Sequence, residues 1–157
     1  MKNGIDQKNV IAKFSPSKIY ALIMVSPFLL LSTLAIIVSI IFYPILIFLG
    51  IVLSFMAWVR YISVIYIKYT LTLETLTVRT GIISRQFNNL ELYRVKDYIV
   101  TQSVSERLFG LMTVTLITND ISNPTVKLQG VLVSNITETI RDLVQKARNN
   151  NRILEIN

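Results

Sequence analysis

"IYALIMVSPFLLLSTLAIIVSIIFYPILIFLGIVLSFMAWV", residues 19–59, is a run of 41 residues without one acidic or basic side chain. A helix that crosses about 30 Å of hydrocarbon needs roughly 20 apolar residues, so this run is long enough for two crossings. Proline disfavours helix at the residue before it and is tolerated in the first turn of a new helix, which marks Tyr43 and Pro44 as the point of reversal. The stretch predicts a transmembrane helical hairpin over residues 19–67, with helices at 19–42 and 44–66.

The composition of the whole chain agrees with a membrane protein. The 157 residues are 52% hydrophobic and their mean hydropathy is +0.55, above the usual range of a soluble domain. Two buried helices of a soluble protein are an alternative, but a domain of this size could hardly cover both helices on all sides. A signal peptide is a further alternative, which the length of the run and the absence of a small-residue cleavage site disfavour.

Small and polar residues inside the run predict how the two helices pack. Gly50 and Ser54 have the small-x-x-x-small spacing that lets helices approach closely, and we expect them to pack within the hairpin. The alternative is that this narrow face receives another membrane protein or an incoming peptide. Pro27 should kink the first helix, and Ser26 is placed to satisfy the carbonyl that Pro27 leaves free. Residues 61–67, "YISVIYI", are β-branched enough to be an early strand, although the end of a helix is favoured.

Charges around the run predict its orientation. Residues 1–18 form a basic arm with four lysines and one aspartate, whereas the tip of the hairpin carries no positive charge. The positive-inside rule therefore places both termini in the cytoplasm and the protein in a bacterial cytoplasmic membrane. Basic and aromatic side chains near the ends of the hairpin are expected to anchor it at the water interface: Lys18, Trp58, Arg60, Tyr61 and Tyr66.

After residue 67 the hydrophobic pattern changes to period two, which is typical of half-buried strands. Short strands are expected at residues 69–73, 76–79, 82–85, 90–93, 95–102, 113–118 and 125–131. From Ile136 to Ala147 apolar residues recur at helical spacing, which predicts an amphipathic helix followed by a flexible tail at residues 149–157. We therefore expect an α+β fold, in which an antiparallel β-barrel or sandwich at residues 68–148 is capped by a C-terminal helix.

Several short motifs in this region resemble one family. They are Tyr-x-Leu-Thr at residues 69–72, Gly81, Leu-x-x-Val-Lys-Asp at 92–97, Gln-Ser at 102–103 and Arg-Leu-Phe-Gly at 107–110. In order and spacing they resemble the second class of bacterial pleckstrin-homology-like (PH-like) domains, which occur beside membrane segments. The resemblance implies a PH-like domain on a membrane anchor, with no catalytic residues. Because some relatives act as immunity proteins against leaderless bacteriocins, the resemblance also leaves open a narrower alternative, which is self-protection against a cationic bacteriocin of this kind.

The side chains available for catalysis are few. Cysteine and histidine are absent, which excludes disulfides, thiolate or imidazole metal sites and the side chain most used for proton transfer near neutral pH. The carboxylates of Glu91, Asp97, Glu106 and Asp120 have no spacing that pairs them on one helix face. We therefore expect no enzyme, metal or cofactor, and the alternative is an enzyme whose site is built on loops around a residue such as Asp97.

Basic residues are the better candidates for binding. Six of them could contact anionic lipid or a protein partner: Arg79, Arg85, Arg94, Lys96, Arg107 and Lys127. The alternative is an ordinary solvated face, because Glu74, Glu91 and Asp97 lie among them in the sequence. Nucleic acid is not expected, since no aromatic and basic stripe stands out. The polar segment at residues 102–110 is interpreted as a corner between strands.

Overall fold

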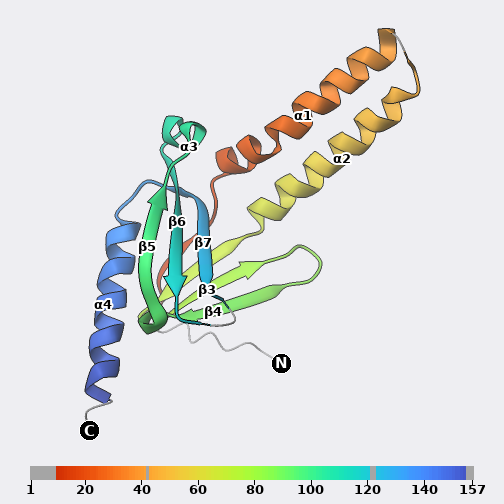
Figure 1. Cartoon of the computed structure of the whole chain (residues 1–157). Helices are drawn as coiled ribbons and strands as arrows, with labels where there is room; N and C mark the ends of the chain where they lie inside the picture. The colour runs from red at the N-terminus through yellow and green to blue at the C-terminus, as the bar shows by residue number, and fades with distance from the viewer. Residues whose placement is uncertain (1–9, 42, 121–122, 155–157) are drawn as a thin grey trace.

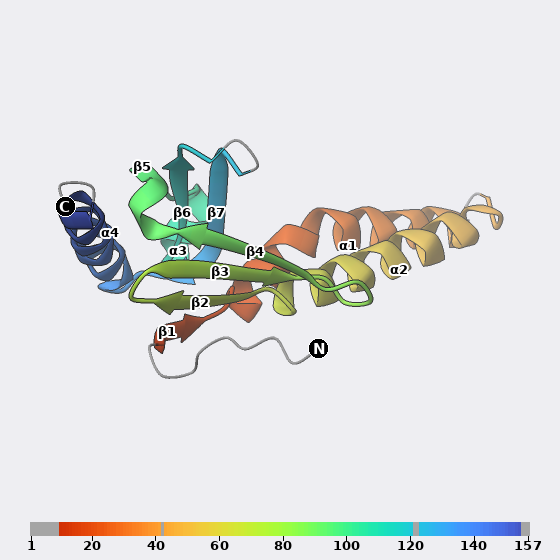
Figure 2. The same cartoon turned by 90° about the horizontal axis from the view of Figure 1, so that it is seen from below.

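The computed structural model describes residues 10–41, 43–120 and 123–154, and it has the expected α+β composition (Figure 1). Two long helices leave one end of a body that is made of two antiparallel sheets and a C-terminal helix (Figure 2). The elements in chain order are β1 (Val10–Phe14), α1 (Lys18–Ile41), α2 (Leu46–Ile65), β2 (Lys68–Thr72), β3 (Thr75–Thr80), β4 (Gln86–Glu91), η2 (Leu92–Arg94), β5 (Val95–Thr101), α3 (Val104–Leu108), β6 (Leu111–Thr118), β7 (Thr125–Leu132) and α4 (Ile136–Leu154).

Helices α1 and α2 form the predicted hairpin, and both are long and apolar enough to cross a membrane by length and composition. They turn at residues 43–45, where the Ser39 hydroxyl donates to the carbonyl of Pro44 (3.1 Å). Residue 42, the predicted end of the first helix, lies outside the described residues. The second helix continues to Ile65, so the segment "YISVIYI" is mostly helical and the strand begins only at Lys68.

Pro27 lies inside α1, and its missing N–H leaves the carbonyl of Ile23 without the usual helical donor. The Ser26 hydroxyl donates to that carbonyl at 2.8 Å. The predicted role of Ser26 is therefore confirmed. A side-chain hydroxyl replaces the backbone hydrogen bond that proline removes.

The strands form two separate sheets, with the orders β1-β2-β3-β4 and β5-β6-β7. Within the described residues no ladder joins β4 to β5 or β7 to β1, so the predicted barrel is wrong and the alternative, a sandwich, is correct. The 3-10 turn η2 follows β4 directly and redirects the chain, so β5 begins a new sheet instead of extending the first. Helix α4 packs against η2 at this corner.

Strand β1 belongs to the region that the sequence predicted to be only a basic arm, and its presence is a correction. It pairs with β2 in antiparallel register, with Lys13 opposite Thr70 and Phe14 opposite Tyr69. The rings of Phe14 and Tyr69 lie 5.2 Å apart. The whole hairpin is thus inserted between two neighbouring strands of one sheet.

The strand expected at residues 82–85 is also absent, and β4 lies at Gln86–Glu91 instead. Gly81 has φ +100°, and a Cβ atom there would lie only 1.8 Å from the carbonyl oxygen of Ser84. The chain therefore folds back tightly over residues 81–85, and only a residue without a side chain fits at its start.

The two sheets and α4 enclose one apolar core. The apolar face of α4 contributes Ile140, Leu143, Val144 and Ala147, so the predicted capping helix is confirmed. Helix α4 continues to Leu154, so the predicted flexible tail is wrong for residues 149–154, and residues 155–157 lie outside the described residues. The guanidinium of Arg148 donates to the carbonyl oxygens of Val95 and Lys96, which ties α4 to the start of β5.

Candidate functional site

The outer face of the first sheet carries a pocket with three cationic side chains. Its volume is about 270 Å³ and its lining consists of Val10, Lys13, Lys68, Thr70, Thr77, Arg79 and Phe87. Residues that pair directly across strands point to the same face of a sheet. The pairs Lys13–Thr70, Thr70–Thr77, Lys68–Arg79 and Arg79–Phe87 therefore bring the lining residues of four strands together.

The register also places the pocket beside the hairpin. Lys68 is the first residue of β2 and follows the end of α2 by three positions, and Arg79 lies opposite it near the end of β3. Lys13 precedes the start of α1 by five positions. The three cations therefore lie in the part of the sheet that adjoins the base of the hairpin.

The cations of the pocket have no acidic partner within the described part of the chain. Arg94 is the basic residue in both ion pairs found there, so neither ion pair includes Lys13, Lys68 or Arg79. The Arg79 guanidinium lies over the Phe87 ring, 5.3 Å from its centroid, and the Thr77 hydroxyl donates to the Asn89 side-chain oxygen at 2.9 Å. Three uncompensated positive charges around a small cavity suit an anionic ligand with several oxygen atoms, such as a phosphate.

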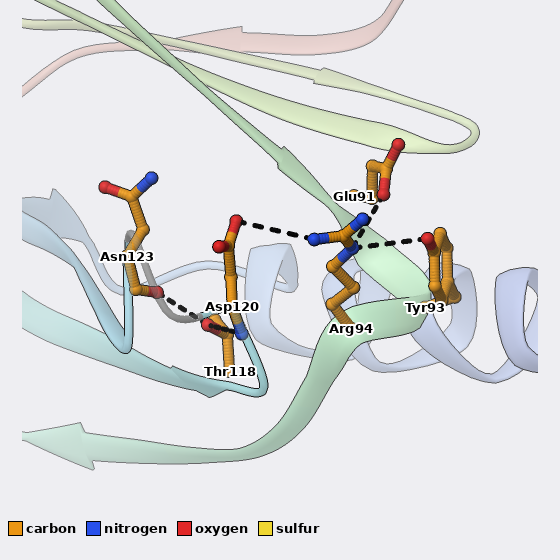
Figure 3. A network of polar contacts seen from close by, with 6 residues as sticks. All are labelled: Glu91, Tyr93, Arg94, Thr118, Asp120 and Asn123. Carbon is orange, nitrogen blue, oxygen red and sulfur yellow. Dashed lines mark hydrogen bonds and ion pairs between the residues drawn. The ribbon is translucent and has the colours of Figure 1, made fainter.

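Arg94 has a different environment from Arg79. Its Nε lies 2.8 Å from a Glu91 carboxylate oxygen and donates to the Tyr93 hydroxyl at 3.2 Å, and its Nη1 lies 3.8 Å from a carboxylate oxygen of Asp120 (Figure 3). The hydrogen bond to Tyr93 and the charge of Glu91 raise the pKa of Arg94 above its ordinary value. Arg94 therefore links the corner after β4 to the loop after β6.

That loop is itself organised by polar contacts. The Thr118 hydroxyl donates to the Asn123 carbonyl at 2.5 Å and accepts from the Asp120 N–H at 3.1 Å (Figure 3). The network shown in Figure 3 thus has a structural explanation in turn geometry and ion pairing. Among the described residues there is no cluster of three acidic side chains that could hold a metal ion.

The six predicted contact residues do not gather in one patch. Arg79 lines the pocket and Arg94 joins the network of Figure 3. Arg85 and Arg107 are exposed in the loop after β3 and in α3. Lys96 and Lys127 are exposed on strands of the second sheet.

The predicted hairpin residues lie as follows. Gly50 is buried, its carbonyl accepts from the Ser32 hydroxyl at 3.0 Å, and the hydroxyls of Ser32 and Ser54 lie 2.6 Å apart.

The five expected interface anchors all lie at the end of the hairpin next to the sheets. Of these, Lys18, Trp58, Arg60 and Tyr66 are exposed, whereas Tyr61 is half-buried.

The polar segment at residues 102–110 is a corner between β5 and β6, as predicted, and contains the short helix α3. Ser103 caps this helix, because its hydroxyl accepts from the Glu106 N–H (3.3 Å) while the Glu106 carboxylate accepts from the Ser103 N–H (2.8 Å). The Thr113 hydroxyl donates to the other carboxylate oxygen at 2.7 Å. Burial alone would raise the pKa of Glu106, but these hydrogen bonds outweigh it and lower the pKa below its ordinary value.

Sequence reasoning missed two of the three pocket cations, Lys13 and Lys68. Lys68 stands at the change from helical to alternating pattern, so its place at the start of a strand was visible. Lys13 could not be assigned, because its strand was hidden in the arm and its pairing partner lies more than fifty residues later. The pocket depends on the register of four strands, which a local pattern does not specify.

Comparison with known proteins identifies the family. No curated protein and no solved structure matches the chain. A family model described as the bacterial PH domain matches residues 20–148, which include α1 without its first two residues, the whole of α2, the strands from β2 onward and most of α4. This match confirms the resemblance of the sequence motifs, and the chain belongs to the bacterial PH domain family.

Proposed function

We propose that this protein is a non-enzymatic binding module that its hairpin anchors in the cytoplasmic membrane, where the cationic pocket takes an anionic group at the inner leaflet. The observation that carries the proposal is the position of the pocket. Lys13, Lys68 and Arg79 lie where the sheet meets the base of an apolar hairpin. In a membrane, that position is close to the headgroups of anionic lipids.

The surface of the hairpin supports the membrane anchor. Large apolar side chains are exposed along both helices, among them Leu30, Ile40, Phe48 and Phe55. A patch of this length is much larger than the apolar patches of soluble monomers, and hydrocarbon would cover it. The pairing of β1 with β2 requires that both ends of the hairpin lie on the same side of that membrane.

Cysteine labelling tests the anchor and its orientation, because the chain has no native cysteine. We expect Tyr43→Cys, in the turn between α1 and α2, to react with an impermeant maleimide on intact cells. Leu73→Cys, in the turn between β2 and β3, should react only after the cells are opened. Labelling of Leu73→Cys on intact cells would show that the orientation is opposite to the proposed one. If neither cysteine reacted in opened cells, the two turns would not be accessible to the reagent.

Binding of a soluble short-chain phosphatidylglycerol to the full chain in micelles tests the pocket. Each cation near an anionic surface contributes about 1 kcal/mol, so the double variant Lys68→Gln with Arg79→Gln should bind about thirtyfold more weakly. The double variant Lys96→Gln with Lys127→Gln removes two exposed lysines from the second sheet and is the matched control. Equal weakening by both double variants would show that general charge, and not the pocket, holds the lipid.

A narrower alternative is immunity against a cationic, membrane-active bacteriocin. It is favoured by the net charge of +7 and by the long exposed surface of the hairpin, which could repel or intercept such a peptide in the bilayer. Expression in a sensitive strain should then raise the inhibitory concentration of a leaderless bacteriocin. No rise for any such peptide would contradict this alternative and leave the anchored binding module unaffected.

A further inference from the structure

Two apolar tips flank the base of the hairpin. One is the loop at residues 81–85 between β3 and β4, where Ile83 is 98% exposed, and the other is α3, where Val104 is 82% and Leu108 is 77% exposed. Figure 1 shows α3 next to the first turns of α1, and Figures 1 and 2 show the β3–β4 loop at the end of the first sheet that lies toward the hairpin. The β2–β3 turn lies at the opposite end of the first sheet (Figure 2).

Both tips combine apolar side chains with an arginine. Arg85 follows Ile83 by two positions, and Arg107 precedes Leu108, and both arginines are exposed. The single acidic residue in the two tips is Glu106, which is 6% exposed and accepts hydrogen bonds from Ser103 and Thr113. The outward surface of the tips is therefore apolar and positively charged.

The tips hold their apolar side chains out by well-defined local structure. Val104 and Leu108 are four positions apart on α3 and so share one face of that helix, while Glu106 points inward and fixes the helix to β6 through Thr113. Gly81 allows the tight fold of the other tip. Exposed apolar side chains that gather at the end of a domain beside an exposed apolar hairpin extend one apolar surface, and such a surface indicates a contact.

We propose that both tips insert into the headgroup region of the anionic membrane that the hairpin spans, so that the domain is held against the bilayer at three places. This inference rests on the proposed membrane anchor and adds the orientation of the domain. Two observations favour a lipid surface over a protein partner. The tips adjoin the hairpin, which continues into the same bilayer, and their arginines match anionic phosphates while the apolar side chains suit the acyl boundary.

Fluorescence of the full chain in vesicles tests this placement. Single cysteines replace Ile83, Leu108, Leu73 and Val52 in turn, and each carries the polarity-sensitive dye NBD. The vesicles contain equal amounts of phosphatidylcholine and phosphatidylglycerol. Nitroxide lipids quench the dye either near the headgroups or near the bilayer centre. Val52, exposed in the middle of α2, reports on the anchor, and Leu73, exposed in the β2–β3 turn, is the control for a domain surface away from the membrane.

We expect blue-shifted emission and quenching by the shallow nitroxide at positions 83 and 108, with water-like emission at 73 and quenching by the deep nitroxide at 52. Water-like emission at 83 and 108 together with deep quenching at 52 would overturn the inference and leave the anchor intact. Absence of deep quenching at 52 would instead reject the proposed anchor. Shielding of 83 and 108 that persists in micelles and grows with protein concentration would indicate a second copy of the chain, and would also overturn the inference.

The contribution of charge is tested with the labelled position 83. The variant Arg107→Gln with Arg85→Gln should reduce the shallow quenching in vesicles that contain phosphatidylglycerol. It should have little effect in vesicles of phosphatidylcholine alone. The double variant Lys96→Gln with Lys127→Gln is again the matched control. Equal quenching of both double variants in the anionic vesicles would show that the arginines do not contact the lipid.

Discussion

At the residue scale, Gly130 connects the hairpin to the second sheet. Its φ is +60°, its carbonyl accepts from the Ser17 N–H at 2.8 Å, and a Cβ atom there would lie 2.2 Å from Cγ of Tyr20. Tyr20 is in the first turn of α1 and is buried. The contact between the hairpin and the second sheet therefore requires a residue without a Cβ atom at position 130.

The variant Gly130→Ala should lower the free energy of unfolding by about 2–4 kcal/mol, because a left-handed backbone and a steric overlap are both imposed. Gly110→Ala is a matched control, since Gly110 has φ +63° with no atom within 4 Å of the Cβ position. It should lose only the backbone contribution, about 1 kcal/mol. Denaturation in micelles measures both variants, and equal losses would contradict the contact with Tyr20.

The lowered pKa of Glu106 predicts that the stability of the fold depends on pH. Its pKa is lower in the folded chain than its ordinary value of 4.5, so its stabilising contribution is complete above about pH 4.5 and is lost as the pH falls through the folded pKa. Glu106→Gln should be less stable at neutral pH and lose less on acidification. Denaturation midpoints between neutral and acidic pH measure this, and parallel curves for both proteins would contradict it.

At the scale of elements, the hairpin depends on close approach of its helices. A Cβ atom on Gly50 would lie 2.6 Å from Cγ1 of Ile36 and 3.4 Å from the carbonyl oxygen of Ser32. Gly50→Leu should therefore separate the helices, break the hydrogen bonds of Ser32 and cost about 1–3 kcal/mol. The amount of full-length protein in membranes measures the effect, with Val52→Leu on the exposed side of α2 as control. Equal accumulation of both variants would contradict the packing.

The sequence predicted the helices better than the strands, for a physical reason. The long uncharged run is visible in the sequence itself, and α1 begins within one residue of its predicted start. Strand β4 instead reads "QFNNLE", and with Leu90 its only buried side chain it resembles a loop. Strand β4 forms because it pairs with β3, and β1 likewise forms because it pairs with β2. The local sequence alone therefore does not identify either strand.

At the scale of the whole molecule, β1 makes the N-terminal segment part of the domain. Deletion of residues 2–14 should expose the edge of β2 and remove the contact of Phe14 with Tyr69, which should cost about 2 kcal/mol or more. It should also remove Lys13 from the cationic pocket. Limited proteolysis of the full chain in micelles should be faster for this variant, and deletion of residues 2–9, which leaves β1 intact, is the control. Equal rates for both deletions would contradict a stabilising role for β1.

The insertion of the hairpin between β1 and β2 has a consequence for biogenesis. During synthesis β1 leaves the ribosome well before its partner, and it must wait until both helices and β2 have followed. In the proposed membrane anchor, insertion of the hairpin would return the chain to its starting side and bring the two strands together, which would reduce the entropic cost of closing so long a loop. A chain whose helices fail to insert would leave β2 without this neighbour, and an unpaired strand edge is prone to aggregation. If the hairpin is the proposed membrane anchor, completion of the first sheet would therefore depend on correct insertion of the hairpin.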